Sequence, residues 1–344
     1  MKKNELIIPP HYDSSKAGQF WKVEYEKIAA SAADWSRQNN IKPSSEDKFK
    51  ICLLAVDMQN TFCLPGFELF VAGRSGTGAV EDTGRLCEFI YRNLNVITEI
   101  IPTMDTHQPL QIFHSIFLVN KKGEHPAPYT LIPVEDIERG LWMVNKHVCK
   151  SLNLDFEKAQ EYLLHYTGEL KKGGKYNLTI WPYHAMLGGI GYALVSSFEE
   201  AVFFHSVARY CQPDIQIKGN NPLTEHYSVF GPEVKEDING KKIAHKNTPL
   251  LEKLMEYDAI VIAGQAKSHC VAWTIDDLLQ DFLLKKKHLT EKVYLLEDCT
   301  SPVVIPGVID YTEEAAKAFK KFADYGMHIV KSTDPVSKWP GMKI

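Results

Sequence analysis

Apolar runs of strand length alternate with helical patterns along most of this chain, and this alternation limits the fold more than any other feature. The segment FKICLLAVD (49–57) is almost wholly apolar, as expected for a strand covered on both faces. Similar runs follow at 98–105, 111–119, 214–219, 257–265, 292–298 and 328–332. Helical patterns lie between several of them, at 82–97, 198–210, 269–284 and 313–326. We therefore predict an α/β fold with a doubly wound, mostly parallel sheet in a Rossmann-like three-layer arrangement.

Two segments depart from this alternation. Residues 1–48 precede the first strand and carry an amphipathic pattern over 16–39, so we predict an N-terminal helical extension. Residues 120–178 interrupt the main domain, which we place at 49–335, and we interpret them as a large insertion because connections of that length usually carry their own structure. We predict one helix inside this insertion, at DFEKAQEYLLHYT.

Composition limits the partners of this protein. The net charge of −4 provides no basic field that would attract nucleic acid. No apolar run approaches the ~20 residues that span a bilayer, so we expect no membrane segment. The seven cysteines include no CxxC pair, and their number is odd, which favours a reducing, cytoplasmic setting over a disulfide framework. A homo-oligomer is left open.

Polar side chains stand where the predicted strands end. Asp57 closes the first strand, Asp105 and His107 close the second, Lys218 closes DIQIKG, and Cys270 follows IVIAGQAKSH. Ligands of open parallel sheets bind outside the carboxyl ends of the strands, so these groups are expected to share one cleft. An acid, an amine and a thiol brought together there form a candidate catalytic site.

Cys270 is the candidate nucleophile. It stands at the predicted start of a helix, where unpaired N–H groups favour the thiolate, and Lys218 is expected to lower its pKa further. The alternative is a buried, inert cysteine, an interpretation that we give to Cys52, Cys87 and Cys299. A dyad with His269 is our second choice, because neighbours in a helix do not share a face and His269 should point elsewhere.

The metal candidates are Asp105, His107 and His184. The D-x-H spacing places the first two side chains on one side of an extended segment, and carboxylate with imidazole suits zinc, iron or manganese. His184 lies in TIWPYHAMLG, so only the fold can bring it close. His114 is a further candidate ligand, with a core position as the alternative. The Gly-rich pieces GRSGTG and GGIG match no nucleotide-binding pattern, which argues against a nucleotide-dependent oxidoreductase.

Taken in order, the motifs resemble those of the isochorismatase-like cysteine hydrolases, and specifically their nicotinamidase branch. VDMQNTF, IKGNNPLTEHYSVFG and AGQAKSHCV resemble the three segments that carry that family's catalytic triad. MDTH and WPYH resemble the metal motifs of nicotinamidases, which isochorismatases and several related amidases generally lack. The resemblance covers about residues 49–117 and 176–335. Thr61 and Ala185 depart from the family pattern, which usually has Asp and Cys at these places.

The resemblance implies an isochorismatase-like fold with Asp57, Lys218 and Cys270 as the triad. It also implies a cis peptide at Gln265–Ala266 and an oxyanion hole formed by the backbone N–H groups of Ala266 and Cys270. Asp105, His107 and His184 would hold a divalent metal ion, with zinc ahead of iron and manganese. Phe62, Trp181 and Tyr227 would contact the substrate.

The activity implied is hydrolysis of nicotinamide to nicotinate and ammonia through a thioester, a reaction of NAD salvage. Two alternatives remain open: a related hydrolase acting on another amide or a ureido compound, and a catalytically silent binding member. The insertion at 120–178 lies between the two metal motifs, so we expect it to be able to cover the pocket.

Overall fold

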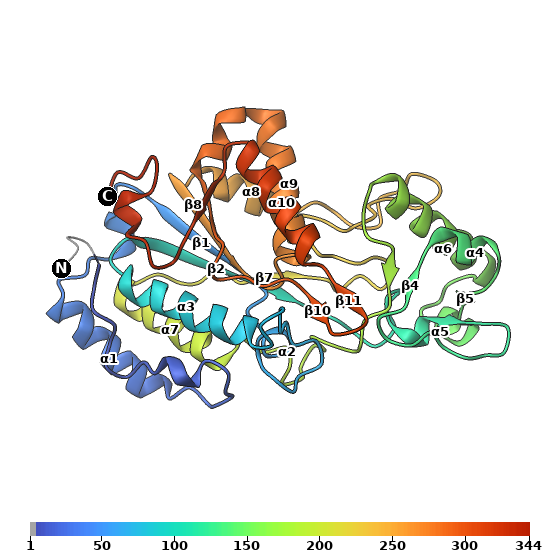
Figure 1. Ribbon diagram of the computed structural model, residues 1–344, viewed down its shortest axis with the longest axis horizontal. Coiled ribbons are helices and arrows are strands. Elements are labelled where there is room, and N and C mark those ends of the chain that lie inside the picture. The colour runs from blue at the N-terminus through green and yellow to red at the C-terminus, as the bar shows by residue number, and fades with distance from the viewer. Residues whose placement is uncertain (1–4) are drawn as a thin grey trace.

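A sheet of six strands forms the centre of the molecule (Figure 1). The computed structural model describes residues 5–344, apart from the side chain of Lys287. The strands lie in the order β12–β9–β8–β1–β2–β7, and each neighbouring pair is parallel. Their bounds are Ile51–Val56 (β1), Ile97–Asp105 (β2), Gln216–Lys218 (β7), Ala259–Gly264 (β8), Val293–Leu296 (β9) and His328–Val330 (β12). The predicted α/β fold with a mostly parallel sheet is confirmed.

The register of the sheet aligns the carboxyl ends of its middle strands. β1 lies between β2 and β8, and all of its residues are buried, as its apolar sequence predicts. Val56 at the end of β1 pairs with Gly264 at the end of β8, and Asp105 at the end of β2 pairs with Lys218 at the end of β7. The polar residues that end these strands are therefore brought to one edge.

Helices cover both faces of the sheet (Figure 1). One face carries α1 (Tyr25–Gln38), α3 (Gly78–Arg92) and α7 (Ser196–Arg209), and the other carries α8 (Thr248–Met255), α9 (Cys270–Lys285) and α10 (Thr312–Asp324). A single turn of helix, α2 (Asn60–Cys63), follows β1. Short 3-10 helices lie at Ser14–Lys16, Ser44–Glu46, Ser115–Phe117, Lys287–Lys292 and Val336–Lys338. A hairpin of β10 (Val304–Ile305) and β11 (Ile309–Asp310) precedes α10.

The segment 120–178 forms a separate lobe beside the sheet, at the right of Figure 1. Its elements are β4 (Leu131–Ile132), α4 (Val134–Glu138), β5 (Met143–Val144), α5 (Lys146–Ser151), α6 (Phe156–Lys172) and β6 (Leu178–Thr179). β4 pairs antiparallel with β6, and β5 pairs antiparallel with β3 (Leu118–Val119). The helix expected within the insertion is present as α6, which runs five residues beyond the predicted segment.

The prediction of a sheet strand at 111–119 is wrong. Only Leu118–Val119 is a strand, and it pairs within the inserted lobe instead of the central sheet. Before it the backbone turns, because the N–H of His114 donates to the carbonyl of Gln111 at 2.9 Å. Phe113 is nevertheless buried, so the apolar run belongs to a buried loop. Hydrophobicity alone does not distinguish such a loop from a strand.

The helix predicted at 16–39 is shorter, since α1 begins at Tyr25. The hydroxyl of Ser196 accepts a hydrogen bond from the Trp21 N–H at 3.0 Å and donates to the Trp21 carbonyl at 2.8 Å. A side chain thus satisfies the backbone where a helix would otherwise do so. α1 packs along α7, and the boundary placed at residue 48 stays a prediction. Between residues 5 and 344, no helix has the length and apolar character needed to cross a membrane.

Candidate active site and metal centre

Three predicted residues meet at the carboxyl edge of the sheet: Asp57, Lys218 and Cys270, which we name the sulfur cluster. Lys218 Nζ lies 2.9 Å from Asp57 Oδ2 and 3.6 Å from Cys270 Sγ. A carboxylate oxygen of Asp57 lies within 4.8 Å of the sulfur. All three side chains are buried. The sequence placed these residues in one cleft, and the structure has them there; their chemical roles stay predictions.

The end of β1 is held tightly against its neighbours. The N–H of Asp57 donates to Thr103 Oγ1 at 3.0 Å, and that hydroxyl donates to Asp57 Oδ1 at 2.5 Å. On the other side, a Cβ placed on Gly264 would lie 2.0 Å from the carbonyl oxygen of Val56, and its φ is +116°. Only glycine permits this approach of β8 to β1, which sets the loop bearing Cys270 beside Asp57.

Burial and charge act against each other on Lys218. Burial lowers the pKa of Lys218, but the negative charges of Asp105 and Asp57 raise it by a larger amount. The pKa of Lys218 therefore lies well above its ordinary value. The ammonium has three donors, and its contacts are Asp57 Oδ2, Asp105 Oδ1 at 3.0 Å and the carbonyl of His226 at 3.0 Å. Lys218 is therefore charged and fixed.

The expectation that Cys270 has a lowered pKa is wrong. Its place at the first residue of α9 is confirmed, and Lys218 does lower the pKa of the thiol. Burial is the larger effect, however, and it raises that pKa well above the ordinary value. The resting group is a thiol, so a nearby base is needed to form the nucleophile.

Two backbone N–H groups beside the sulfur are free to bind an oxyanion. Neither the Ala266 nor the Cys270 N–H donates a hydrogen bond to another group in the part of the chain that the structure describes. The peptide bond between Gln265 and Ala266 is cis, as the resemblance implies. Ala266 lines the same cavity as Cys270. These observations fit the predicted oxyanion hole.

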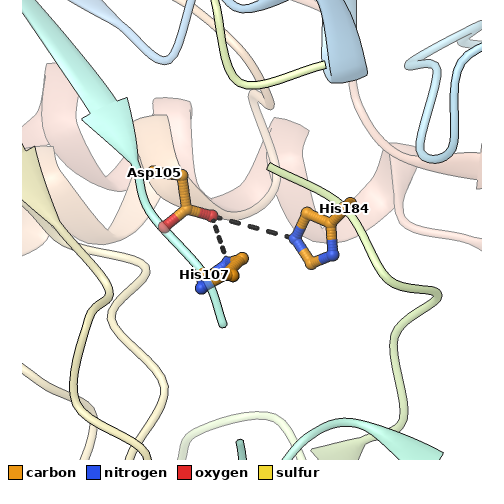
Figure 2. Close-up of side chains that lie close together, drawn as sticks. All are labelled: Asp105, His107 and His184. Atoms are coloured by element: carbon orange, nitrogen blue, oxygen red, sulfur yellow. Dashed lines mark hydrogen bonds and ion pairs between the residues drawn. The ribbon is translucent and has the colours of Figure 1, made fainter. Parts of the chain in front are cut away.

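A second group of side chains, Asp105, His107 and His184, forms what we name the Asp-His-His cluster (Figure 2). One nitrogen from each ring and one oxygen of the carboxylate lie within 4.8 Å of one another. Nε2 of His107 lies 2.8 Å from Asp105 Oδ2, and Nε2 of His184 lies 3.8 Å from the same oxygen. Asp105 ends β2, His107 follows it two residues later, and His184 comes from the loop that precedes α7.

The orientation of both rings suits a metal ion. Nδ1 of His107 lies 3.2 Å from the carbonyl oxygen of Gly219, and Nδ1 of His184 lies 2.7 Å from that of Pro182. A carbonyl only accepts, so Nδ1 carries the proton in each ring, and Nε2 is directed at Asp105. Metal-binding histidines are held in this way. Two imidazoles with one carboxylate are a donor set for zinc, iron or manganese.

His114, the further candidate ligand, does not join this cluster. Its ring centroid lies 6.0 Å from that of His107, and its Nδ1 lies 3.1 Å from the carbonyl oxygen of Pro109. Its ring lies edge-on to those of His107 and His184 instead.

A cavity of about 30 Å³ joins the two clusters. Its lining includes Cys270, Ala266, Asp105 and His184 together with the three predicted substrate contacts Phe62, Trp181 and Tyr227. The indole Nε1 of Trp181 donates to the Tyr227 hydroxyl at 3.0 Å, which fixes these two walls against each other. The predicted aromatic walls therefore surround the thiol.

Sequence reasoning missed one polar residue of this cavity, Glu225, and predicted a second, His269, to point elsewhere. Glu225 stands two residues before Tyr227 in TEHYS, and alternate residues of an extended segment share a side, so this signal was available. Burial raises the pKa of Glu225 to about 8. His269 was expected to point elsewhere, but it precedes α9 as its N-cap, with φ −123° and ψ −100°, so the helical rule does not apply.

The inserted lobe contacts the residues that precede Cys270. Tyr176 donates its hydroxyl to the carbonyl of Ser268 at 3.0 Å, and its ring centroid lies 4.8 Å from that of His269. The insertion thus packs against the two residues that precede Cys270, and its covering of the pocket stays a prediction.

Three other cysteines fit the interpretation as buried side chains outside the site. Cys52, Cys87 and Cys299 are completely buried, and burial raises the pKa of each. Each of the seven cysteines is free of a disulfide.

Comparisons with known proteins bear on the fold. No family model matches the chain, and no curated protein sequence matches it. Solved structures do resemble it. The yeast nicotinamidase bound to the inhibitor nicotinaldehyde has a TM-score of 0.50 and 19% identity, over 82% of this chain and 99% of its own. A nicotinamidase/pyrazinamidase of Acinetobacter baumanii has a TM-score of 0.47 and 18% identity, over 84% and 99% of the two chains.

A pyrazinamidase of Pyrococcus horikoshii in complex with zinc has a TM-score of 0.41 and 18% identity, over 82% and 98% of the two chains. At such identities, the likeness to the yeast enzyme establishes a shared fold. The α/β fold that the resemblance implies is thereby confirmed, and the roles of individual residues stay predictions.

Proposed function

We propose that this chain is a metal-containing cysteine amidohydrolase that converts nicotinamide to nicotinate and ammonia. The observation that carries the proposal is the position of Lys218 Nζ, 3.6 Å from the Cys270 sulfur, 2.9 Å from Asp57 and 3.0 Å from Asp105. One ammonium therefore joins a thiol, a base and the Asp-His-His cluster. This reaction would belong to NAD salvage, and the free cysteines fit a reducing cytoplasm.

Asp57 is the general base in this proposal. Burial raises its pKa, opposed by Lys218, which makes the carboxylate a stronger proton acceptor than a free aspartate. Asp57 takes the thiol proton as the sulfur attacks the carboxamide carbon. The C–S bond forms, and the carbonyl π electrons move to the oxygen, which then accepts hydrogen bonds from the Ala266 and Cys270 N–H groups.

The intermediate then collapses towards the thioester. Asp57 passes its proton to the amide nitrogen, the C–N bond breaks, and ammonia leaves. A water molecule enters, Asp57 accepts one of its protons, and the oxygen attacks the thioester carbon. The C–S bond breaks, the sulfur regains a proton, and the carboxylic acid is released.

Asp105, His107 and His184 would hold the metal ion, for which we propose zinc ahead of iron and manganese. When bound, the ion would supply a Lewis acid that accepts the lone pair of a ring nitrogen and so orients the substrate. Phe62, Trp181 and Tyr227 provide flat apolar walls for the ring. Because the cavity of about 30 Å³ is smaller than an aromatic amide, binding requires these walls to move apart.

The test is turnover of nicotinamide, followed as ammonia and nicotinate, with elemental analysis of the bound metal. We expect activity in the wild-type chain and a loss of more than about 10⁴-fold in Cys270→Ala, with fold and metal content unchanged. Cys211→Ala is the matched control, since Cys211 is half-buried and lies outside the cavity. Turnover retained by Cys270→Ala would remove the sulfur from the mechanism. Nicotinaldehyde, an inhibitor of the yeast enzyme, serves as a second probe of the thiol.

A second candidate is hydrolysis of another amide or of a ureido compound. It is favoured by His269, whose buried Nε2 has no hydrogen-bond partner among residues 5–344 and which lines the cavity. A substrate with a second polar group would satisfy this atom better than a bare ring. A panel of amides with ammonia detection separates the two. Failure of Cys270 to react with iodoacetamide at neutral pH would instead favour a catalytically silent binding protein.

A further inference from the structure

A buried carboxylate on α3, that of Asp82, lies behind the loop that follows β8. The residue is 1% exposed and takes no part in lining the cavity of Cys270. Its Oδ2 accepts a hydrogen bond from Nε2 of Gln265 at 2.9 Å, and its Oδ1 accepts one from Nη2 of Arg85 at 2.9 Å. Asp82 therefore contacts the anchors of the loop directly, through Gln265 and through a hydrogen bond with the Ser301 side chain.

Gln265 is completely buried, and both ends of its side-chain amide are held. The NH₂ group donates to Asp82, and the oxygen accepts from the Ser301 N–H at 3.4 Å. Its backbone N–H donates to the Val56 carbonyl at 2.8 Å, which ties the residue to the end of β1. Side chain and backbone of Gln265 are thus anchored to three different segments.

Ala266, which lines the cavity, follows Gln265 directly. The next backbone anchor of the loop is Lys267, whose N–H donates to the Ser301 carbonyl at 2.8 Å. The peptide unit that carries the Ala266 N–H lies between these two anchors. Its direction depends on how Gln265 is held, and the side-chain contacts to Asp82 and Ser301 supply that restraint.

A carboxylate at position 82 fixes the orientation of the Gln265 amide. A carboxylate only accepts hydrogen bonds and a backbone N–H only donates, so one orientation of the amide satisfies both Asp82 and Ser301. An asparagine at position 82 could either donate or accept and would lose this constraint. Burying a charge costs solvation free energy, and the partner Arg85 is 35% exposed and compensates Asp82 only in part. If position 82 served only to fill space in the core, a neutral residue would be more favourable there.

We propose that Asp82 is a positioning residue that holds the Ala266 N–H in the oxyanion hole by fixing the side chain of Gln265. The inference rests on the proposed amide hydrolysis and deepens it. An oxyanion donor acts over a narrow range of distance and direction, and losing one typically lowers the rate by about 10²–10³-fold. A donor that is displaced but still present should lower it less.

The test compares Asp82→Asn with the wild-type enzyme in its metal-loaded form. We expect kcat for nicotinamide to fall about 10- to 100-fold, while KM changes less than about threefold. Binding of nicotinaldehyde should weaken by a similar factor, because its adduct with the thiol carries an oxyanion. Alkylation of Cys270 by iodoacetamide forms no oxyanion, so its rate should stay within about twofold. A general loss of structure would reduce turnover and alkylation together.

Glu88→Gln is the matched control on the same helix, since Glu88 also pairs with an arginine, Arg92, at 3.9 Å and lies away from the loop. It should leave each of these quantities unchanged. Gln265→Met removes the hydrogen bond between residues 82 and 265 from the Gln265 side. This variant tests the positioning role if Asp82→Asn does not fold. Wild-type kcat in whichever variant folds would overturn the positioning role alone. Absence of turnover and of aldehyde binding in the wild type would overturn the proposed function and this inference with it.

Discussion

The sulfur cluster and the Asp-His-His cluster share one edge of the sheet, but they are built differently. The sulfur cluster takes its members from the ends of β1 and β7 and from the start of α9. The Asp-His-His cluster takes one member from the end of β2, a second from just beyond it and a third from a loop some eighty residues further along the chain. One depends on strands that are aligned by the sheet, and the other depends on a loop packed over it.

The two clusters also differ in how their charges are satisfied. Lys218 compensates Asp57 within the sulfur cluster at 2.9 Å. In the other cluster, two imidazole nitrogens are directed at the same oxygen of Asp105, an arrangement that a cation completes. Under the proposed function, the first cluster would perform the nucleophilic chemistry and the second would hold the metal. Asp105 links them, because its other oxygen lies 3.0 Å from Lys218.

Replacing Lys218 tests that link and should have the largest effect. Lys218→Met leaves Asp57 and Asp105 buried without their shared cation, and removing one partner of a buried ion pair typically destabilises a protein by ~3–5 kcal/mol. We expect turnover to fall roughly 10³-fold. Chemical denaturation and steady-state kinetics measure the two effects.

The matched control is Lys253→Met. Lys253 also contacts two carboxylates, Glu99 at 2.6 Å and Asp214 at 2.9 Å, but outside both clusters. It is 32% exposed, so its loss should change stability by about 1 kcal/mol or less and leave turnover intact. Equal effects of the two variants would show that the position of Lys218 has no special importance.

His184→Ala should separate the clusters. We expect loss of stoichiometric metal and a fall in nicotinamide turnover of roughly 10²-fold, because a bound ion contributes several kcal/mol to substrate orientation. Alkylation of Cys270 by iodoacetamide should continue at its wild-type rate. Elemental analysis and the alkylation rate give the two readouts.

His205→Gln controls for the loss of a buried histidine, since His205 bonds to the Ile97 carbonyl at 2.9 Å, away from both clusters. It should keep its metal. Unchanged metal content in His184→Ala would remove that residue from the ligand set.

The sequence was sufficient for the strands that both layers of helices cover. Every residue of β1 and β8 is buried, and the uninterrupted apolar runs in their sequences predict this. The same reasoning predicted that Asp57, Asp105 and Lys218 lie in one cleft, because the carboxyl ends of parallel strands meet at one edge of the sheet. The failure at 111–119 has the converse cause: a buried loop is as apolar as a strand, and only its turning hydrogen bonds distinguish it.

Properties that depend on packing over long distances were beyond this reasoning. His184 could be named only through its WPYH motif, because a loop's place above the sheet is not encoded in local periodicity. The raised pKa of Cys270 was missed because burial, which is a tertiary property, outweighs the helix N-terminus and Lys218. His269 was misplaced because a rule for helix interiors was applied to a residue that precedes the helix.

Gly219 lies where the two clusters meet, so its substitution tests how closely they are packed. A Cβ there would lie 2.5 Å from Asp105 Oδ1 and 3.0 Å from His107 Cε1, and its φ is +88°. We expect Gly219→Ala to destabilise the fold by about 3 kcal/mol through strain and this close contact, and to reduce metal content.

Gly240→Ala provides the comparison, since its φ is +74° but a Cβ would meet nothing within 4 Å. It should lose only about 1–2 kcal/mol, from the left-handed backbone alone, and keep its metal. Denaturation midpoints that coincide for the two variants would mean that the clusters tolerate displacement.

The loss of turnover at low pH should show which of the two clusters is responsible for it. Burial raises the pKa of Asp57 above its ordinary value of 3.8, with Lys218 opposing. The carboxylate is the active form, so kcat/KM should fall as the pH drops through this raised pKa, about tenfold for each further unit. Metal content measured over the same range should remain constant. If kcat/KM instead falls in parallel with metal content, the pH dependence belongs to the Asp-His-His cluster. The assignment of Asp57 as the base would then have no support from this experiment.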